Sequence, residues 1–506
     1  MKKWLGDIDN TIFGGAAAIY LTLFVFIIAA KETAEKAISA TLNFTLNQLG
    51  WIYLLSFSLI FIFLMVLAFS GFGKYKLGKP DDKPEYNFAS WIGMLYGAGL
   101  GVGLVFFGVN EPMSHFFFAP FAEAGTPQAA SDAMRISFFH WGMHPWAMYT
   151  ATGLAMAYFQ HRKGLPGRVS SAFEPMLGKD GLNGTVAKVI DIFAMVAILC
   201  GVATSVGFAA NQFSSGLATQ YGFSQSLGLV AASIVIISVL STLSAMKGVA
   251  KGIKIISDAN MIVVLALIAF VLLAGPTMFQ FNTFFETLGN YLNNLPSMSF
   301  FLDANGTVAE KMGYNWVGGW SVMYFAWWVA FAPFVGGFLA SISKGRTIRE
   351  FILACVFVPA ILCFIWFTCF GGSAIHLTMT EAVTTGKEMA TNSNDSLFIF
   401  LRELPLTGLS IFVAMILVQT LIITSVNSAT YVMGAMSSGS RQAEPSLGIR
   451  AFWGAFMGIN ALLFLWVGGM QALRNSSMVG ALPFMIILLF MLVNMVRALK
   501  KENGQA

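Results

Sequence analysis

The sequence predicts an all-α integral membrane protein with twelve transmembrane helices. Of its 506 residues, 57% are hydrophobic and only 10% are charged, whereas about a quarter of the residues in a soluble domain are charged. Apolar runs of about 20 residues, the length that crosses a bilayer as a helix, recur along the whole chain. Lysine and arginine gather on alternate connecting segments, as expected when spans alternate in direction.

The apolar runs give the order of the predicted spans within one membrane domain, residues 1–506. They cover, approximately, residues 11–30, 50–71, 88–110, 136–160, 187–213, 225–246, 259–278, 316–342, 350–371, 406–436, 450–470 and 477–497. The first run begins after ten residues and is too long for the apolar part of a signal peptide. We therefore expect no cleaved leader.

The charges predict the orientation of these spans. With the N-terminus inside, seven of the 29 lysine and arginine residues fall on outer segments: Lys31, Lys36, Arg135, Lys311, Lys387, Arg402 and Arg474. The bias predicts that both termini face the cytoplasm. The net charge of +5 follows from this topology and gives no reason to expect a nucleic-acid partner. All four cysteines (Cys200, Cys355, Cys363 and Cys369) lie within predicted spans, so no disulfide is expected.

Two connecting segments are long, and the tail is short. Residues 279–315 contain "FNTFFETLGNYLNNL", in which apolar side chains recur at helical spacing. This pattern predicts an amphipathic helix on the outer face of the membrane. Residues 372–405 read as a polar outer loop, and residues 499–506 as a short cytoplasmic tail that offers little for osmotic regulation.

The stretch "FHWGMHPWAMY", residues 139–149, places an unusual density of large rings within a predicted span. On a helix, Trp141, Trp146 and Tyr149 fall within an arc of roughly 140° and could line one side of a cavity. The alternative is an aromatic belt at the membrane interface. Trp141 fits a belt, but Tyr149 lies too deep for one.

A second aromatic stretch, "MYFAWWVAFAPFVGG" at residues 323–337, adds Trp327, Trp328 and Phe331 from a different span. Two helices that each offer clustered rings, with no acidic residue beside them, indicate a box of π-faces. Such a box attracts quaternary ammonium groups, which cannot donate hydrogen bonds. We therefore expect the rings to replace an anion at this site.

The span at 88–110 contains Gly97, Gly99, Gly101 and Gly103 within seven residues. Close helix packing through small residues is one explanation. So many glycines also destabilise a helix and favour an unwound segment, whose carbonyls can bind Na⁺ in secondary transporters. The span at 316–342 is interrupted as well, by Pro333. Weak points in the leading helices of spans 3–7 and 8–12 fit an inverted five-helix repeat.

The stretch "LIITSVNSAT", residues 421–430, forms a polar patch in an apolar span that includes Thr424 and Ser425. These hydroxyls could simply bond back to their own helix, or they could bind a hard cation. Deep carboxylates are almost absent, since Asp191, Asp258 and Glu111 sit near predicted span ends. Proton-driven carriers often use such a group, so its absence favours Na⁺ coupling.

Taken together, these motifs resemble the betaine–choline–carnitine transporter family, most of all its Na⁺-coupled glycine betaine transporters. The stretches that carry the resemblance are "HWGMHPWAMYTATGLAMAYFQHRKGLPG" (140–167), "AWWVAFAPFVGGFLASISKGRTIREF" (326–351) and "GLGVG" (99–103). The resemblance implies two extra spans in residues 1–86, a first repeat in 87–278 and a second in 316–498. It also implies a homotrimer to which the outer amphipathic helix contributes.

The resemblance also implies the roles of individual residues. Trp141, Trp146, Tyr149 and Trp328 would form the substrate box, with Trp327 alongside. Phe331 stands where the family often has Trp or Tyr, and it keeps a π-face without a polar group. Sodium ligands would be the carbonyls of Gly97, Leu100 and Leu421 and the hydroxyls of Thr424 and Ser425. Thr204 and Ser205 are candidates for a second sodium site. No cofactor other than the coupling ion is expected.

The expected function is therefore Na⁺-coupled uptake of glycine betaine by alternating access in the inner (plasma) membrane of a prokaryote. The alternatives within transport are carnitine, choline or dimethylsulfoniopropionate as substrate, with proton coupling or exchange. No basic residue lies between Lys188 and Lys247, and no acidic residue lies within the glycine motif. In the family, exchangers carry a basic residue in place of a sodium ion, and choline carriers tend to have an acidic residue within the glycine motif. This chain is unlike both.

A channel and an enzyme are alternatives from other classes. A channel needs rings of carbonyls or charges, and an aromatic box would trap a cation rather than pass it. For an enzyme, His140 and His144 stand four residues apart without a third ligand. We expect them to pack or hydrogen-bond locally, and we expect no enzymatic activity.

Overall fold

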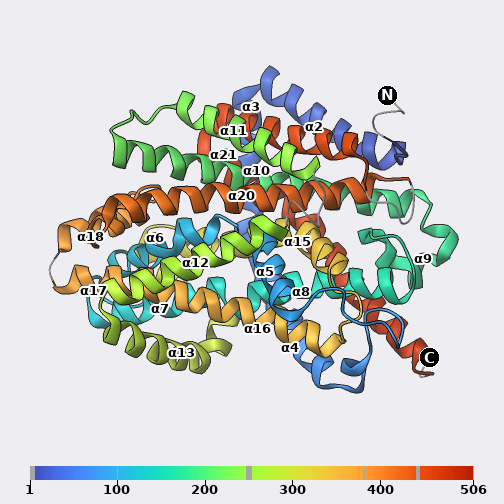
Figure 1. Ribbon diagram of the computed structural model, residues 1–506, viewed down its shortest axis with the longest axis horizontal. Helices are drawn as coiled ribbons and strands as arrows, with labels where there is room; N and C mark the ends of the chain where they lie inside the picture. The colour runs from blue at the N-terminus through green and yellow to red at the C-terminus, as the bar shows by residue number, and fades with distance from the viewer. Residues whose placement is uncertain (1–5, 100, 247–253, 381, 440–444, 505–506) are drawn as a thin grey trace.

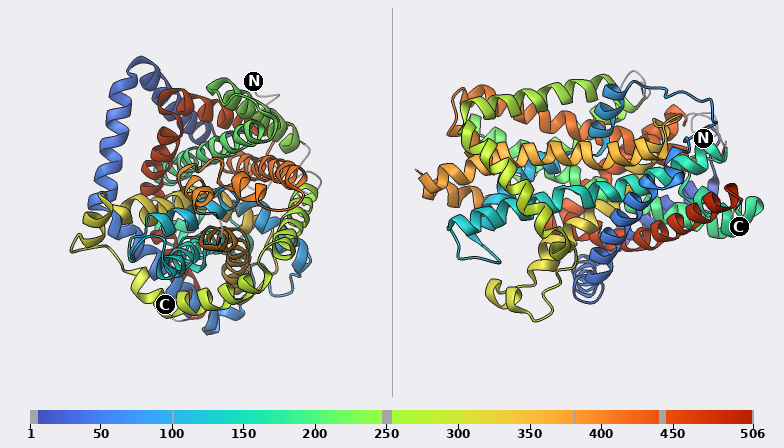
Figure 2. Two further views of the ribbon diagram at one scale, coloured as in Figure 1. Left: turned by 90° about the vertical axis from the view of Figure 1, so that its left-hand side faces the viewer. Right: turned by 90° about the horizontal axis from the view of Figure 1, so that it is seen from below.

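The chain is almost entirely helical in the residues that the computed structural model describes, which are 6–99, 101–246, 254–380, 382–439 and 445–504. The helices that build the bundle are α2 (Asn10–Ala29), α3 (Lys31–Gln48), α4 (Gly50–Phe69), α5 (Phe88–Gly99), α6 (Gly103–Phe117), α7 (Pro127–Trp141), α8 (Met143–Ala157), α10 (Thr185–Tyr221), α11 (Leu227–Met246), α12 (Lys254–Ala274), α15 (Met323–Ser341), α16 (Ile348–Phe367), α20 (Thr407–Ser437) and α21 (Leu447–Glu502). Most of them run along the longest axis of the molecule (Figure 1). Seen from one end, many appear end-on as a single bundle (Figure 2).

The number of apolar spans differs from the prediction. Among the described residues, ten helices are long and apolar enough to cross a membrane, and the bent pair α5 and α6 makes up to eleven. The predicted span at 136–160 is divided between α7 and α8 at Gly142, where φ is −93° and ψ is −139°. A Cβ at Gly142 would lie 2.4 Å from the carbonyl oxygen of Phe138, so the break requires glycine.

The last two predicted spans lie within one helix, α21. Its apolar parts are Leu447–Val467 and Arg474–Glu502. Between them Gly469 has a φ of 60°, a left-handed conformation that interrupts a regular helix. The two apolar stretches are therefore separated by a change of backbone direction rather than by a loop.

The expectation of a polar loop at 372–405 is wrong, because this segment folds into three short helices. They are α17 (Ser373–Thr380), α18 (Val383–Thr391) and α19 (Ser396–Arg402). Their apolar side chains, such as Met389 and Phe398, are buried. Asn110 and Ser114 of α6 donate hydrogen bonds to the carbonyl of Ala390 at 3.4 and 3.2 Å. Packing against α6 thus orders a segment whose composition alone predicts a loop.

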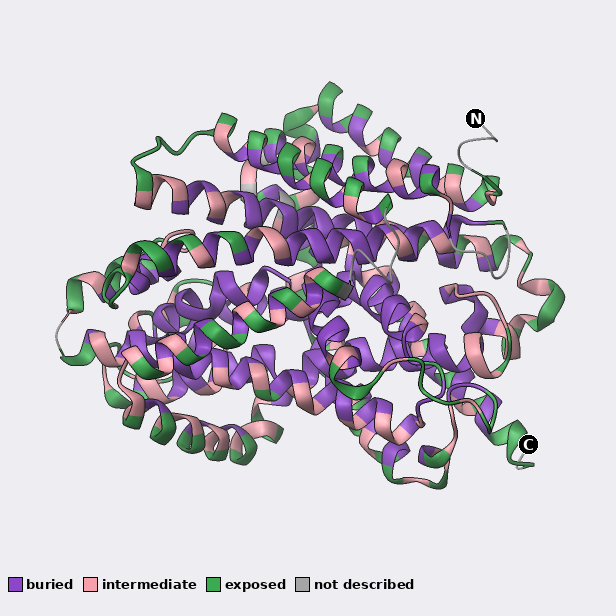
Figure 3. Ribbon diagram, viewed as in Figure 1, coloured by how far each residue is buried: buried purple, intermediate pink, exposed green. Residues whose placement is uncertain are grey.

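The predicted amphipathic helix is α13 (Thr277–Ser299), which lies along the outside of the bundle (Figure 1). Its surface is largely exposed or half-buried (Figure 3). The exposed apolar side chains include Met278, Phe281, Phe285 and Leu292. At the opposite end of the long axis, the start of α2 and the end of α21 lie at the same end of the molecule (Figure 1).

The core of the bundle lies around α15. Every residue in the apolar window of Gly318–Ser341 is buried, and the helix occupies the buried centre of the molecule (Figure 3). It packs closely on α8 and also contacts α10, α20 and α21. Gly336 permits the contact with α8, since a Cβ there would lie 2.6 Å from the Cγ2 of Thr152.

Candidate functional site

The rings of the first aromatic stretch come from two helices rather than from one. Because the chain breaks at Gly142, Trp141 is the last residue of α7, while Trp146 and Tyr149 belong to α8. All three side chains are buried. The rings of Trp146 and Tyr149 meet edge to face, with centroids 5.6 Å apart. Trp141 therefore does not share a helix face with Trp146 and Tyr149, as it would on one continuous helix.

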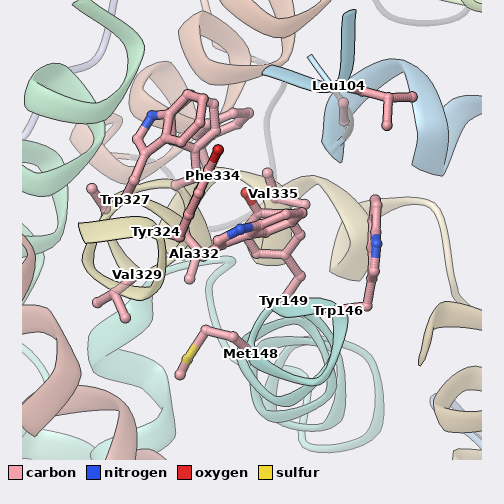
Figure 4. Close-up of a cluster of buried hydrophobic side chains, with 14 of the residues drawn as sticks. Leu104, Trp146, Met148, Tyr149, Tyr324, Trp327, Val329, Ala332, Phe334 and Val335 are labelled. Carbon is pink, nitrogen blue, oxygen red and sulfur yellow. The ribbon is translucent and has the colours of Figure 1, made fainter. Parts of the chain in front are cut away.

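Trp328 of α15 joins these three rings into one cluster. Its ring centroid lies 5.6 Å from that of Trp141, 5.5 Å from that of Trp146 and 4.8 Å from that of Tyr149. Figure 4 shows Trp146 and Tyr149 rising from α8 toward side chains of α15. We call Trp141, Trp146, Tyr149 and Trp328 the aromatic box. Its rings come from three helices, since α7 and α8 supply the first three and α15, far along the chain, supplies Trp328.

Trp327 and Phe331 lie beside the box. They line a small cavity together with Trp141, Tyr149, Trp328, Ser205 and three glycines of the broken helix. The cavity measures 20 Å³, about enough for one water molecule. Among the described residues, no hydrogen-bond acceptor meets the indole nitrogens of Trp327 and Trp328. These two buried donors are therefore available to a bound molecule.

The glycine motif forms the break between α5 and α6. Helix α5 ends at Gly99, α6 begins at Gly103, and the two are bent by 67° relative to each other. Gly101 has a φ of 49°, which side chains other than glycine rarely adopt. A Cβ at Gly99 would lie 2.9 Å from the ring of Trp146, and one at Gly103 would lie 2.7 Å from Trp327 and 2.8 Å from Trp141. The missing side chains allow the indoles to lie directly on this backbone.

Three of the residues predicted to bind sodium, Leu421, Thr424 and Ser425, lie on α20 close to this break. The hydroxyls of Thr424 and Ser425 both donate to the carbonyl of Leu421, at 2.8 and 3.1 Å. All three residues are buried. A Cβ built on Gly101 would lie 3.6 Å from the Oγ of Ser425, so α20 approaches the break closely. The hydrogen bonds are also those of the simpler alternative, in which hydroxyls bond back to their own helix.

The other predicted sodium ligands occupy different positions. Gly97 faces α12, since a Cβ there would lie 2.2 Å from the Oγ of Ser257. Leu100 lies outside the described residues. Thr204 of α10 donates to the carbonyl of Cys200 at 3.0 Å. Ser205 lines the cavity beside the aromatic box, so this candidate for a second sodium site borders the space between the rings.

The expectation that no carboxylate stands beside the rings is wrong. Glu111 of α6 is fully buried and accepts a hydrogen bond of 2.7 Å from the indole nitrogen of Trp141. Its other oxygen lies 2.7 Å from Nδ1 of His140. The sequence places Glu111 near a span end, but the bend at the glycine motif redirects α6 so that this residue meets the end of α7. The sequence signal that could have indicated a carboxylate here is His140, the residue that directly precedes Trp141.

The two histidines of the first aromatic stretch have different partners. His144 lies 3.0 Å from the hydroxyl of Ser299 and stacks on Phe61, which is the local packing expected of it. His140 instead joins a cluster with Glu111 and His115. The expectation that no third ligand stands near His140 is therefore wrong. Because the chain breaks at Gly142, the spacing of four residues does not put the two imidazoles on one helix face.

All four cysteines are buried as free thiols. Outside the membrane-spanning helices, burial acts to raise the pKa of Asp303, but the hydrogen bonds from the backbone amides of Val308 and Ala309 and from Thr307 together outweigh it and lower this pKa. This carboxylate caps α14 (Thr307–Met312) and takes no part in the cavity beside the aromatic box.

Comparison with known proteins agrees with the family that the motifs indicate. The model of the betaine/carnitine/choline family transporters matches residues 11–504. The glycine betaine transporter OpuD of Bacillus subtilis is 40% identical over 497 residues, which cover 98% of this chain and 95% of that protein. A probable glycine betaine transporter of Desulfitobacterium hafniense is 37% identical, with 98% of each chain covered. The ectoine/hydroxyectoine transporter of Virgibacillus pantothenticus is also 37% identical, over 99% of this chain and 98% of its own.

Proposed function

Because this chain belongs to the betaine/carnitine/choline family of transporters, we propose that it takes up glycine betaine by Na⁺ symport with alternating access. Transport across a membrane, rather than catalysis, is the activity of the family. The observation that supports glycine betaine as the substrate is the aromatic box, in which α7, α8 and α15 bring four rings close to the glycine break. The proposal extends the family's activity to one substrate and one coupling ion.

The aromatic box fits the trimethylammonium group of this substrate. A quaternary ammonium group binds ring faces by cation–π attraction, which is worth roughly 0.5–2 kcal/mol for each contact. The rings exclude water and discriminate against small, strongly hydrated cations. The carboxylate of Glu111 lies behind Trp141, to which it is hydrogen-bonded, and adds a negative charge near the box without occupying the cavity.

The carboxylate of glycine betaine also finds donors beside the box. The indole nitrogens of Trp327 and Trp328 are buried and lack acceptors among the described residues. A substrate oxygen that accepts from them would satisfy donors that otherwise remain unpaired in the membrane interior. A zwitterion therefore uses both the ring faces and the indole edges of this site.

The site has to open before substrate binds. The cavity of 20 Å³ holds no more than a water molecule, and the box rings already pack against one another. The structure is thus a closed arrangement in which the rings fill the space of the trimethylammonium group. Parting of α15 from α7 and α8 would admit substrate, and such a movement is what alternating access requires.

Sodium coupling is proposed from the oxygens opposite the break. Thr424, Ser425 and the Leu421 carbonyl provide oxygen atoms within one buried patch. Hard cations prefer such ligands. Since α20 approaches Gly101 in the broken helix, an ion held there would join the two repeats and stabilise one arrangement of the box. Ser205, together with Thr204, is the candidate for a second ion.

A test of the substrate and the ion uses the purified chain in liposomes. Labelled glycine betaine should enter saturably when an inward Na⁺ gradient is imposed, and should not enter when K⁺ replaces Na⁺. Unlabelled choline, carnitine, dimethylsulfoniopropionate and ectoine serve as competitors. Uptake driven by a pH gradient without Na⁺ would overturn the symport. Ectoine is the substrate named for one of the relatives. If unlabelled ectoine competed more strongly than unlabelled glycine betaine, ectoine would be the preferred substrate.

The arrangement in the membrane is proposed on separate grounds. The start of α2 and the end of α21 lie at one end of the molecule (Figure 1), and the excess of basic residues on inner segments supports the cytoplasmic side of a prokaryotic inner membrane for that end. The exposed apolar residues of α13 would contact neighbouring copies in a homotrimer. Cross-linking through a cysteine introduced at Phe285, which is 67% exposed, should trap trimers, and a ladder that stops at dimers would contradict this assembly.

A further inference from the structure

We propose that Glu111, His115 and His140 form a binding site for a divalent transition metal ion, with Zn²⁺ as the preferred ion. The three residues lie next to the aromatic box, on the side predicted to face outward. Imidazole nitrogen and carboxylate oxygen are the ligands that suit Zn²⁺ in sites with three protein ligands. The metal site does not depend on the proposed substrate, whereas its effect on uptake rests on the proposed function.

The spacing of the ligand atoms fits one ion. Glu111 and His115 stand one helical turn apart on α6, and His115 Nε2 lies 3.7 Å from Glu111 Oε1. His140 Nδ1 of α7 lies 2.7 Å from the same oxygen. All three ligand atoms lie within 4.8 Å of one another. A tetrahedral ion with bonds of about 2.0–2.1 Å holds its ligand atoms about 3.3 Å apart, so shifts of an ångström or so complete the site.

An unpartnered nitrogen points into this cluster. His115 is 1% exposed, and its Nε2 has no hydrogen-bond partner among the described residues. The rings of Trp316 and Trp320 pack against the imidazole, with centroids 5.5 and 4.4 Å away. A buried polar atom without a partner costs stability. A metal ion coordinated by Nε2 would remove that cost.

The second shell of a metal site is already present. Nε2 of His140 lies 2.8 Å from the hydroxyl of Ser321. When Nδ1 coordinates an ion, Nε2 keeps the remaining ring proton and donates it to Ser321. Trp141 donates to Glu111 Oε2, which leaves Oε1 for the ion. Partners of this kind orient the ligands of bound metals.

The charge and proton balance of binding can be stated. One carboxylate and two neutral imidazoles leave a net charge of +1 with Zn²⁺, and a water molecule takes the fourth position. Coordination removes the proton from His140 Nδ1, because the ring binds the ion through that nitrogen. A ring that is neutral beforehand moves this proton to Nε2 and releases none, whereas a ring that carries both protons beforehand releases one proton to solvent for each ion bound.

A route to the site exists. A cavity of 230 Å³ is lined by His140, Ser321 and Trp316, so it reaches both a proposed ligand and the second shell. Arg135 also lines this cavity, but its guanidinium pairs with Asp132 at 2.9 Å, which reduces its repulsion of a cation. An ion can thus approach without crossing the aromatic box.

The bound ion would connect the metal site to transport. It would tie α6 to α7 and fix Glu111, which holds the indole of Trp141. Movement of α7 relative to the broken helix would then be restricted, and the box would open less readily. We therefore expect Zn²⁺ added outside to inhibit uptake reversibly.

The site is tested by direct metal binding to the purified full chain, using isothermal titration with Zn²⁺ and the absorption spectrum of Co²⁺. We expect one ion per chain, with a tetrahedral Co²⁺ spectrum. Since loss of even a second-shell partner weakens metal binding by about 10–100-fold, His115→Gln should weaken it at least as much. His115 makes no hydrogen bond through Nε2, so this variant should fold, and Glu111→Gln and His140→Gln provide further tests.

His376→Gln is the matched control, because His376 lies on α17 and packs on Phe279, away from the cluster. This variant should bind Zn²⁺ as the parent does. Unchanged binding in His115→Gln, or equal loss in His376→Gln, would overturn the site. In liposomes, inhibition by Zn²⁺ is compared with the uptake of each variant before metal is added, and EDTA should reverse it. Binding without inhibition would overturn the link to transport, and binding without any uptake would overturn the proposed function but not the site.

Discussion

The indole nitrogen of Trp141 donates a hydrogen bond of 2.7 Å to the carboxylate of Glu111, which stands in a different helix. Neither side chain reaches solvent to a significant extent, since Trp141 is 2% exposed and Glu111 is 0% exposed. The bond fixes one wall of the aromatic box and places a negative charge behind the ring. The anion that the first aromatic stretch lacks is therefore supplied by the broken helix.

Replacing this carboxylate should destabilise the protein. Glu111→Gln keeps an acceptor for Trp141 but removes the charge that pairs with His140. Hydrogen bonds to a charged group contribute about 1.5–3 kcal/mol, so we expect the thermal midpoint of the purified protein to fall. Glu286→Gln on the exposed face of α13 is the control and should leave the midpoint unchanged. Equal midpoints for the two variants would show that the network contributes nothing to stability.

Trp328 should contribute more to substrate binding than any exposed indole. Its ring contacts the other three members of the aromatic box. Loss of one cation–π contact and of the ring packing should weaken glycine betaine binding about tenfold in Trp328→Leu. Trp51→Leu on α4, where the indole is 51% exposed, is the matched control. Equilibrium binding of labelled substrate measures both, and normal affinity in Trp328→Leu would place the site elsewhere.

The hydroxyls on α20 should determine the sodium dependence of uptake. Thr424→Ala and Ser425→Ala each remove an oxygen beside the Leu421 carbonyl. If one ligand contributes on the order of 1 kcal/mol, the Na⁺ concentration for half-maximal uptake should rise about fivefold. Thr420→Ala removes a hydroxyl that bonds back to Ile416 in the same way but lies outside the buried patch. The assignment fails if all three variants show the same Na⁺ dependence.

The glycine motif should tolerate no side chain where it faces the indoles. In Gly103→Ala the new methyl group would lie 2.7 Å from Trp327 and 2.8 Å from Trp141. Such overpacking typically costs about 1–3 kcal/mol and displaces neighbouring groups, so substrate affinity should fall. Gly14→Ala on α2 meets open space and should leave affinity unchanged. Equal affinities for the two variants would mean that the motif does not support the rings.

The membrane class, most of the long helices and the family could be predicted from the sequence alone. These follow from properties that are local in the chain, because about 20 apolar residues must form a helix to satisfy their backbone in a bilayer. The residues of the aromatic box could also be predicted, because the two aromatic stretches can be recognised directly in the sequence. The glycine motif indicated the break between α5 and α6 for the same local reason.

Which side chains contact one another depends on the packing of the helices and could not be predicted from the sequence. The break at Gly142 assigns Trp141 and Trp146 to different helices, so their proximity depends on how α7 and α8 pack. The bend at the glycine motif turns Glu111 toward Trp141 and gathers His115 and His140 around it. Helices α17 to α19 form where a loop was expected, because all three pack against α6, which also donates hydrogen bonds to backbone carbonyls of α18. Bend directions and helix rotations depend on contacts between residues distant in the chain, and local periodicity carries no information about them.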